Sequence, residues 1–224
     1  MPVGFPGVDG DRNWLAMRLP GGVVLTGKQT DGQKLLTCCS WEDEAGIVRI
    51  QLPSGDSFDC RDPAASAALG VYLSASVQLV RVARYPDALP TNTGDDLRRG
   101  VGYDSSPVHI VTTASLEALG ETHTHRESSD VRRMRPNLLI QANDPSDFAE
   151  ERWVGHHLFF EGSDLVLIVR EPTKRCALPA RAQAGLPADP DLLKALRESD
   201  LQLGVYAAVV NPGLLRSGAA VYIG

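Results

Sequence analysis

The sequence lacks the features that define several large classes of protein. No apolar run approaches the roughly 18 residues of a membrane-spanning helix, and the first residues do not have the charged-then-apolar pattern of a secretion signal. Basic residues are not in excess, because 22 Lys and Arg against 28 Asp and Glu give a net charge of -6. Nonspecific nucleic-acid binding usually needs a basic surface. We therefore predict a soluble cytoplasmic protein that binds neither membranes nor nucleic acid.

Several catalytic motifs are also missing. The chain contains no GxSxG of a hydrolase, no GxGxxG of a dinucleotide site and no HExxH of a zinc protease. Residues 22–28, GVVLTGK, have the spacing of a phosphate-binding loop, but Gln29 occupies the position of the Ser or Thr that would bind magnesium. Nucleotide binding at this segment is therefore not expected.

Cysteine is scarce and is not arranged in pairs. The four cysteines are Cys38, Cys39, Cys60 and Cys176. They form no CxxC motif, which indicates reduced thiols in a reducing compartment rather than a zinc site or a disulfide framework. We interpret the first three as structural residues.

Short extended segments separated by turn residues dominate the chain. Strands are predicted at residues 13–19, 21–27, 46–52, 75–82, 108–112, 137–141, 165–169, 204–210 and 219–224. The apolar run at 165–169 is expected to break at Pro172. Many short strands with few helices predict a mainly β (α+β), barrel-like fold.

Four short helices are predicted from their boundary residues. Asp62 followed by Pro63 is typical of a helix start, and Gly70 is expected to end that helix; residues 114–119 form a second, stopped at Gly120. The other two are predicted at 148–153, after a capping box of Asp147 and Glu150, and at 191–199, after Asp189 and Pro190.

Residues 85–107 are rich in Pro, Gly, Asp and Thr and carry no periodicity, which predicts a long irregular loop. We place a subdomain boundary at its start, which divides the chain into residues 1–84 and 85–224.

Cys176 has the most informative surroundings of the four cysteines. It follows the predicted strand at 165–169 and comes directly after Lys174 and Arg175. Neighbouring cations favour the thiolate, which is both a nucleophile and a soft metal ligand. Two further basic groups precede predicted strands, at Arg12 and at residues 132–135. Arginine binds phosphate through several donors, so these groups predict an anion site beside a reactive thiol.

Five segments, taken in order, resemble the MOSC superfamily, which includes the C-terminal domain of molybdenum cofactor sulfurase and the amidoxime-reducing components. They are GDRNW (10–14), the segment 104–119 that contains VHIVTTASLEAL, RRMRPNLLI (132–140), DFAEERWVG (147–155) and KRC (174–176). The final segment, NPGLLRSGAAVYIG, is similar to the closing PG-x-x-R-x-G-x-x-V of that family.

The resemblance implies a MOSC-like β-barrel domain at 85–224, preceded by an N-terminal β-rich, MOSC-associated subdomain at 1–84. It also implies a bound molybdenum cofactor, a molybdopterin, with Cys176 as the catalytic residue and metal ligand. Seven residues match the cofactor-binding motifs of the family: Arg12, Thr112, Ser115, Arg135, Asn137, Lys174 and Arg175.

By this resemblance the protein is a molybdenum-dependent oxidoreductase that reduces N-hydroxylated small molecules, with electrons from a separate electron-transfer protein. Two features depart from the family pattern. GDR begins at residue 10, where members usually have an earlier strand and a YPVKS-like segment, and the usual PC-x-RC is PTKRC, with Thr173 in place of the first cysteine.

These departures leave two alternatives open. In the first, the protein is a sulfurtransferase, and Cys176 carries a persulfide received from a cysteine desulfurase; the short segment before GDR favours this alternative. In the second, the protein is a noncatalytic module that stores or escorts the cofactor.

Overall fold

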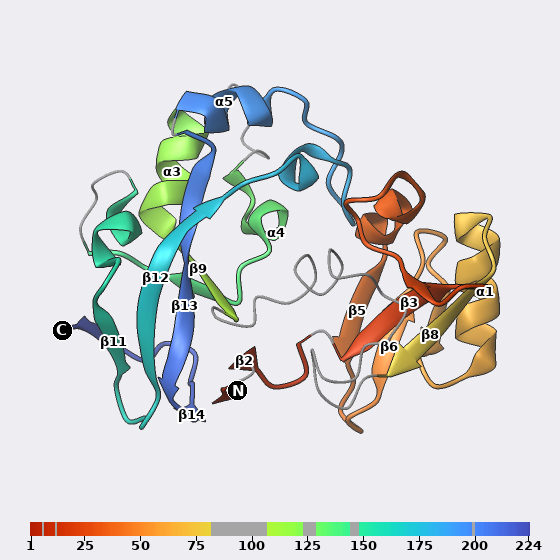
Figure 1. Cartoon of the computed structure of the whole chain (residues 1–224), viewed down its shortest axis with the longest axis horizontal. Coiled ribbons are helices and arrows are strands. Elements are labelled where there is room, and N and C mark those ends of the chain that lie inside the picture. The colour runs from red at the N-terminus through yellow and green to blue at the C-terminus, as the bar shows by residue number, and fades with distance from the viewer. Residues whose placement is uncertain (6, 12, 82–106, 123–128, 144–147, 199) are drawn as a thin grey trace. The chain divides into compact units, whose positions relative to one another are not determined.

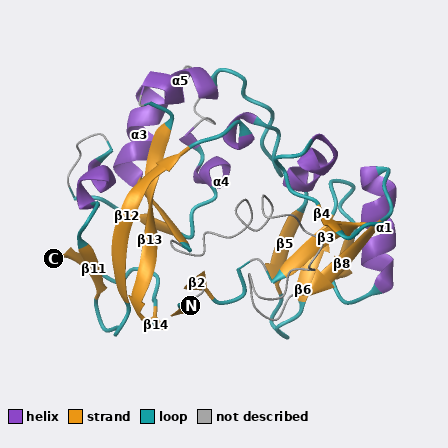
Figure 2. Ribbon diagram, viewed as in Figure 1, coloured by secondary structure: helices purple, strands orange, loops and turns teal. Residues whose placement is uncertain are grey.

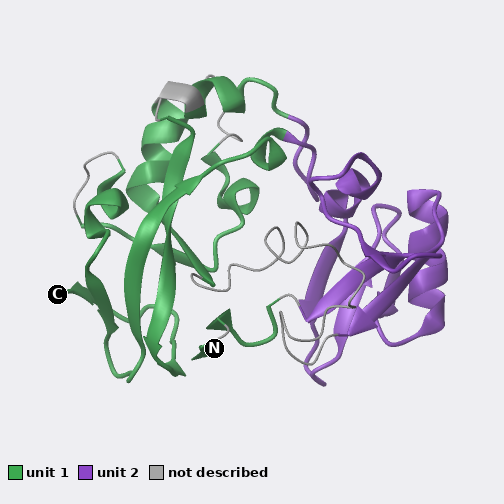
Figure 3. Ribbon diagram, in the orientation of Figure 1, with its two compact units in different colours: residues 1–11, 103–180, 189–224 green, residues 12–102, 181–188 purple. Residues whose placement is uncertain are grey.

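The computed structural model describes residues 1–5, 7–11, 13–81, 107–122, 129–143, 148–198 and 200–224 (Figure 1). The chain forms two compact units (Figure 3): unit 1 comprises Met1–Asp11, Tyr103–Ala180 and Asp189–Gly224, and unit 2 comprises Arg12–Gly102 and Arg181–Ala188. Strands with a few short helices make up the regular structure, which confirms the predicted mainly β fold class. The predicted division between residues 84 and 85 lies outside the described residues and stays a prediction.

Unit 1 is built on a six-stranded sheet of order β10-β9-β13-β12-β11-β15. Figure 2 shows its long, curved strands β12 and β13 side by side. Its strands are β9 (Val108–Thr112), β10 (Leu138–Ile140), β11 (His157–Phe160), β12 (Val166–Lys174), β13 (Gln202–Asn211) and β15 (Val221–Ile223). Strands β9 and β10 are parallel, and the other neighbouring pairs are antiparallel. A smaller sheet joins β1 (Pro2–Gly4), β2 (Gly7–Val8) and β14 (Gly213–Leu214).

Strand β9 is buried along its whole length, which explains its apolar sequence VHIVT. Val108 and Ile110 belong to one hydrophobic cluster with Val205 of the neighbouring β13 and Leu167 of β12, the next strand along the sheet. Val111 belongs to a second cluster that includes Met134. Alternate side chains of a strand point to opposite faces, so β9 separates two cores.

The helices of unit 1 are α3 (Thr113–Thr122), α4 (Val131–Met134) and α5 (Leu192–Glu198), with 3-10 turns η3 (Ala149–Trp153) and η4 (Leu178–Ala180). Helix α3 continues past Gly120, so the predicted stop there is wrong. A Cβ on Gly120 would lie 3.2 Å from the Ser129 Oγ atom, so the glycine serves close packing. The segment predicted as a helix at 148–153 forms η3, which begins at Ala149 after Phe148 without a side-chain cap. Asp147 of the predicted capping box lies outside the described residues.

The described part of unit 2 contains two three-stranded sheets, an α-helix and a 3-10 segment. One sheet has the order β4-β3-β8 and the other β5-β6-β7. The elements are β3 (Trp14–Arg18), β4 (Val23–Val24), η1 (Thr30–Thr37), β5 (Cys39–Glu42), β6 (Val48–Gln51), β7 (Ser57–Asp59), α1 (Pro63–Leu73) and β8 (Val77–Arg81).

Helix α1 begins as predicted and ends later than predicted. The Asp62 carboxylate accepts a 2.8 Å hydrogen bond from the Ala64 amide, which is the expected N-cap. The helix then continues through Gly70 to Leu73, and Ser74 takes the left-handed conformation. A Cβ on Gly70 would approach the Ala75 carbonyl oxygen to 2.9 Å, so glycine is needed for the close return of the chain rather than for the helix end.

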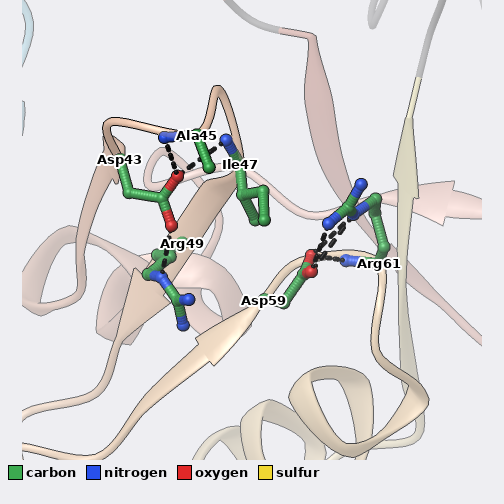
Figure 4. A network of polar contacts seen from close by, with 6 residues as sticks. All are labelled: Asp43, Ala45, Ile47, Arg49, Asp59 and Arg61. Atoms are coloured by element: carbon green, nitrogen blue, oxygen red, sulfur yellow. Dashed lines mark hydrogen bonds and ion pairs between the residues drawn. The ribbon is translucent and has the colours of Figure 1, made fainter.

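Two aspartates, one after β5 and one at the end of β7, each bind an arginine side chain and backbone amides (Figure 4). Asp43 accepts hydrogen bonds from the amides of Ala45 and Ile47 at 3.0 and 2.9 Å and from Arg49 Nε at 2.8 Å. These bonds lower the pKa of the Asp43 carboxyl. Asp59 binds the side chain and amide of Arg61, which lower its pKa to about 2.

Candidate functional site

Cys176 lies just beyond the end of β12 in unit 1. The strand does not break at Pro172 as predicted but continues to Lys174, with Pro172 paired to Val205 next to a register shift. The irregular pairing accommodates a residue that cannot donate an amide hydrogen bond. The side chains of Lys174 and Cys176 are exposed, and Arg175 between them is half-buried. All four cysteines are free thiols, as predicted.

Arg175 faces the interior of unit 1. Its Nη2 atom donates a 2.8 Å hydrogen bond to the Met134 carbonyl, and its Nη1 atom lies 3.2 Å from His109 Nε2. A guanidinium nitrogen only donates, so His109 accepts on Nε2 and carries its ring proton on Nδ1. The Arg175 amide also donates to the Leu201 carbonyl at 2.7 Å. The residue before Cys176 is therefore held by β9, α4 and the chain before β13.

The basic segment at 132–135 divides into three different environments. Arg132 is exposed and forms an ion pair with Asp130 at 2.7 Å, which lowers the pKa of that carboxyl. Arg133 is only 1% exposed, and its Nη1 atom donates to the Pro179 carbonyl at 3.1 Å. Arg135 is exposed and takes the left-handed conformation, with φ of 52°. The cofactor-binding role of Arg135 stays a prediction.

Asn137 connects three segments of unit 1. Asn137 forms two hydrogen bonds with the backbone of His109. The Asn137 backbone N–H donates to the His109 carbonyl at 2.8 Å, and the side-chain Oδ1 atom of Asn137 accepts from the His109 backbone N–H at 2.9 Å. The Nδ2 atom donates to Asp11 Oδ2 at 3.2 Å. The GD of GDRNW and the PN of RRMRPN therefore meet beside β9, although Arg12 itself lies outside the described residues.

Thr112 and Ser115 occupy a different environment. Both are 0% exposed, and their hydroxyls donate to one oxygen of Glu150, Oε2, at 2.7 and 2.5 Å. Glu150 is also fully buried, and its Oε1 atom has no hydrogen-bond partner within the described part of the chain. By the alternation of a strand, Thr112 and His109 lie on opposite faces of β9.

The structure thus associates Arg135, Asn137, Arg175 and Cys176 through contacts with Met134 and His109, and it turns Thr112 and Ser115 toward Glu150. Sequence reasoning did not identify His109 or Glu150 as parts of this arrangement, and it placed Arg133 in the anion site rather than in a buried contact with Pro179. A polar His109 within the apolar run VHIVT was the signal that could have pointed to the first of them. Arg133 and Glu150 become significant only through their buried partners.

A family model for the MOSC domain matches residues 97–222, which is more than half of the chain. The chain belongs to the MOSC domain family. The matched span contains every predicted site residue except Arg12.

Among solved structures, this MOSC protein is similar to the YuaD protein from Bacillus subtilis, with 17% identity and a TM-score of 0.43. The similarity covers 54% of this chain and 64% of that chain. No curated protein matches the sequence. Within the described residues, no helix is long and apolar enough to cross a membrane. No group of three or more His, Cys, Asp or Glu side chains in that same part could hold a metal ion.

Membership of the MOSC family is consistent with a molybdenum-cofactor-associated protein. The side chains at the end of β12 fit such a cofactor, because the Cys176 thiol is exposed and soft and the exposed Lys174 ammonium can bind a phosphate. The hydroxyls of Thr112 and Ser115 do not offer the same fit, since both are buried and bound to Glu150. Their cofactor-binding role stays a prediction.

Proposed function

We propose that this MOSC protein is a molybdenum-cofactor-dependent oxidoreductase in which Cys176 supplies the protein ligand to the metal. The observation that carries the proposal is the exposed thiol at the end of β12, within the span that matches the MOSC family. Thiolate is a soft ligand that suits molybdenum better than it suits hard cations such as magnesium. A single thiolate is sufficient for this role, so Thr173 in place of a second cysteine does not remove it.

Other residues of the chain would bind and orient the cofactor. The exposed side chains of Lys174 and Arg135 would bind the pterin phosphate. Asn137 would fix the backbone that carries Arg135 through its bonds to His109 and Asp11. The cofactor supplies two-electron redox chemistry at its metal, and the protein supplies binding and orientation.

By analogy with the amidoxime-reducing members of the family, the substrates proposed are small N-hydroxylated compounds. The electrons would come from a separate electron-transfer protein. Both assignments rest on family analogy, as does the cytoplasmic location.

Metal and pterin analysis tests the proposal on protein produced in a host that makes the cofactor. The wild-type protein is expected to contain stoichiometric molybdenum and pterin, and Cys176→Ala is expected to lose the metal. Cys39→Ser is the matched control, because Cys39 is the other exposed cysteine and belongs to unit 2. Wild-type protein without molybdenum, or equal molybdenum in Cys176→Ala, would contradict the proposal.

The exposure of Cys176 also supports sulfur transfer as a second candidate, because a persulfide donor must reach the thiol. The Cys176 thiolate would attack the terminal sulfur of a desulfurase persulfide. A new S–S bond forms at Cys176, the old S–S bond breaks, and the desulfurase thiolate leaves. Protein that contains neither metal nor pterin, and that gains one sulfur at Cys176 after exposure to a cysteine desulfurase and cysteine, would favour this function.

A further inference from the structure

Two arginine side chains connect α4 and the Cys176 loop (residues 175–180) in opposite directions. Arg175, directly before Cys176, donates from the loop to the carbonyl of Met134 at the end of α4. Arg133, from within α4, donates to the carbonyl of Pro179, three residues after Cys176. In the chain, the exposed Cys176 therefore lies between Arg175 and Pro179, and both of these residues are hydrogen-bonded to α4.

The two contacts differ from ordinary surface ion pairs in their surroundings. Arg133 is 1% exposed and Pro179 is buried, so water does not compete for this carbonyl. Arg175 is anchored a second time, by His109 of β9, and its amide bonds Leu201. A charged donor gives a stronger hydrogen bond than a neutral one, and the planar guanidinium reaches two acceptors at once. The helix and the loop should move as one body.

We propose that Arg133 and Arg175 are positioning residues that hold Cys176 in a fixed place relative to Arg135. Their guanidinium groups donate hydrogen bonds to backbone carbonyls, so these two cations stabilise the positions of α4 and the Cys176 loop. Arg135 directly follows Met134, and Cys176 directly follows Arg175; one hydrogen bond, from Arg175 to Met134, therefore sets the spacing of the exposed cation and the exposed thiol. The use of that spacing for cofactor binding rests on the proposed function, whereas the positioning itself is a property of the chain alone.

Electron paramagnetic resonance of a nitroxide attached to Cys176 tests this proposal on the full chain without cofactor. The background carries Cys38→Ser, Cys39→Ser and Cys60→Ala, so Cys176 is the single labelled thiol. Arg133→Met and Arg175→Met remove the donors and keep similar side-chain length. Arg132→Met is the matched control, because Arg132 is on the same helix but is exposed and paired with Asp130. Arg133→Lys retains one donor for Pro179 and should restore the wild-type spectrum.

A second label position separates local release from general loosening of unit 1. Glu117→Cys, on the exposed side of α3, carries the nitroxide in a chain that also has Cys176→Ser. We expect the label at Cys176 to become more mobile in Arg133→Met and Arg175→Met and to stay unchanged in Arg132→Met. The label on α3 should not respond to any of these substitutions.

Wild-type mobility at Cys176 in both Met variants, or an equal increase at the α3 position, would overturn the proposal. If Arg133→Met does not fold, Arg175→Met decides, because its side chain is only half-buried. Since the measurement needs no metal, a wild-type protein that lacks molybdenum would refute the proposed function and leave this inference standing. If the protein binds molybdenum but the spectra of both Met variants are unchanged, the positioning inference is refuted and the proposed function stands.

Discussion

The side chain of Asn137 bonds Asp11, 126 residues earlier in the chain, through a 3.2 Å contact between Nδ2 and Oδ2. Its other atom, Oδ1, accepts from the His109 amide. The amide group is therefore used at both ends, once as donor and once as acceptor. An aspartate at position 137 would keep the acceptor and lose the donor. The Asn137–Asp11 bond can therefore be tested with a double-mutant cycle.

Asn137→Asp should lower the free energy of unfolding by about 1–3 kcal/mol, because it removes the donor and places a second carboxylate beside Asp11. Adding Asp11→Asn to that variant should recover most of the loss, since the new amide can donate to the new carboxylate. Urea unfolding of the wild type, both single variants and the double variant measures the coupling. Strictly additive losses would contradict a direct bond.

Gly204 of β13 is expected to tolerate no side chain. Its φ of +84° disfavours other residues, and an added Cβ would lie 2.6 Å from the Ile110 carbonyl oxygen and 2.7 Å from His109 Nε2. Gly204→Ala should therefore destabilise the protein by about 2–4 kcal/mol and displace the ring that accepts from Arg175. Urea unfolding measures the first effect, and the NMR shifts of the His109 ring measure the second.

Gly155→Ala is the control for this substitution. Its φ is +90°, but no atom of the described residues beyond its chain neighbours lies within 4 Å of the added Cβ. Only the backbone cost of about 1–2 kcal/mol therefore applies. Equal losses in the two variants would show that contact with His109 and Ile110 contributes nothing.

Glu150 is expected to stabilise the junction of β9 and α3. Glu150→Ala removes the acceptor of the buried Ser115 hydroxyl, whereas the Thr112 hydroxyl can still donate to Ser115 Oγ at 3.1 Å. One unsatisfied donor should cost about 1–3 kcal/mol. Combining Glu150→Leu with Thr112→Val and Ser115→Ala removes all three polar side chains and keeps the volume of residue 150. This variant should cost less than Glu150→Ala alone, although the Ser115 amide loses its 3.2 Å bond to Thr112 Oγ1. Chemical unfolding of both variants measures the difference, and a greater loss in the triple variant would contradict this account.

Cys38 and Cys39 should differ in reactivity although they are adjacent. Burial, with a smaller contribution from Cys39, raises the pKa of the Cys38 thiol from 9.0 to about 11. A difference of two pH units corresponds to about 100-fold less thiolate near pH 8 than in a thiol of pKa 9.0. Alkylation with iodoacetamide, followed by peptide mass spectrometry, should therefore modify Cys38 slowly until the pH approaches 11.

The same shift affects stability in alkali. The folded pKa of Cys38 is above its unfolded value, so the contribution of the neutral thiol is complete below pH 9 and is lost as the pH rises toward about 11. Cys39→Ser should lower the pKa of Cys38 slightly and speed its alkylation. Rapid alkylation of Cys38 at pH 8 in the wild-type protein would contradict the assigned burial.

The positions of the strands and helices could be predicted from the local sequence, whereas several of their ends could not. The run VHIVT forms a strand that is buried at every position, which suits continuous apolar residues. The run LVLIV leads into β12, in which the buried Leu167 and Val169 alternate with partly buried residues. Gly70, Gly120 and Pro172 are local stop signals, yet α1, α3 and β12 continue through them. Packing against Ala75 and Ser129, and a register shift beside Val205, override the local preference at these points.

The chemistry of the candidate site was readable from the sequence because it depends on residue types that are adjacent in the chain. Lys174, Arg175 and Cys176 place two cations beside a thiol in any fold, and the order of motifs predicted the MOSC family that the family model confirms. Which cation faces solvent was decided only by the tertiary structure. Strand order brings Pro179 within reach of Arg133 and Met134 within reach of Arg175, at separations of 46 and 41 residues. Carbonyl groups carry no sequence signature, so buried hydrogen bonds to them become visible only once the backbone is folded.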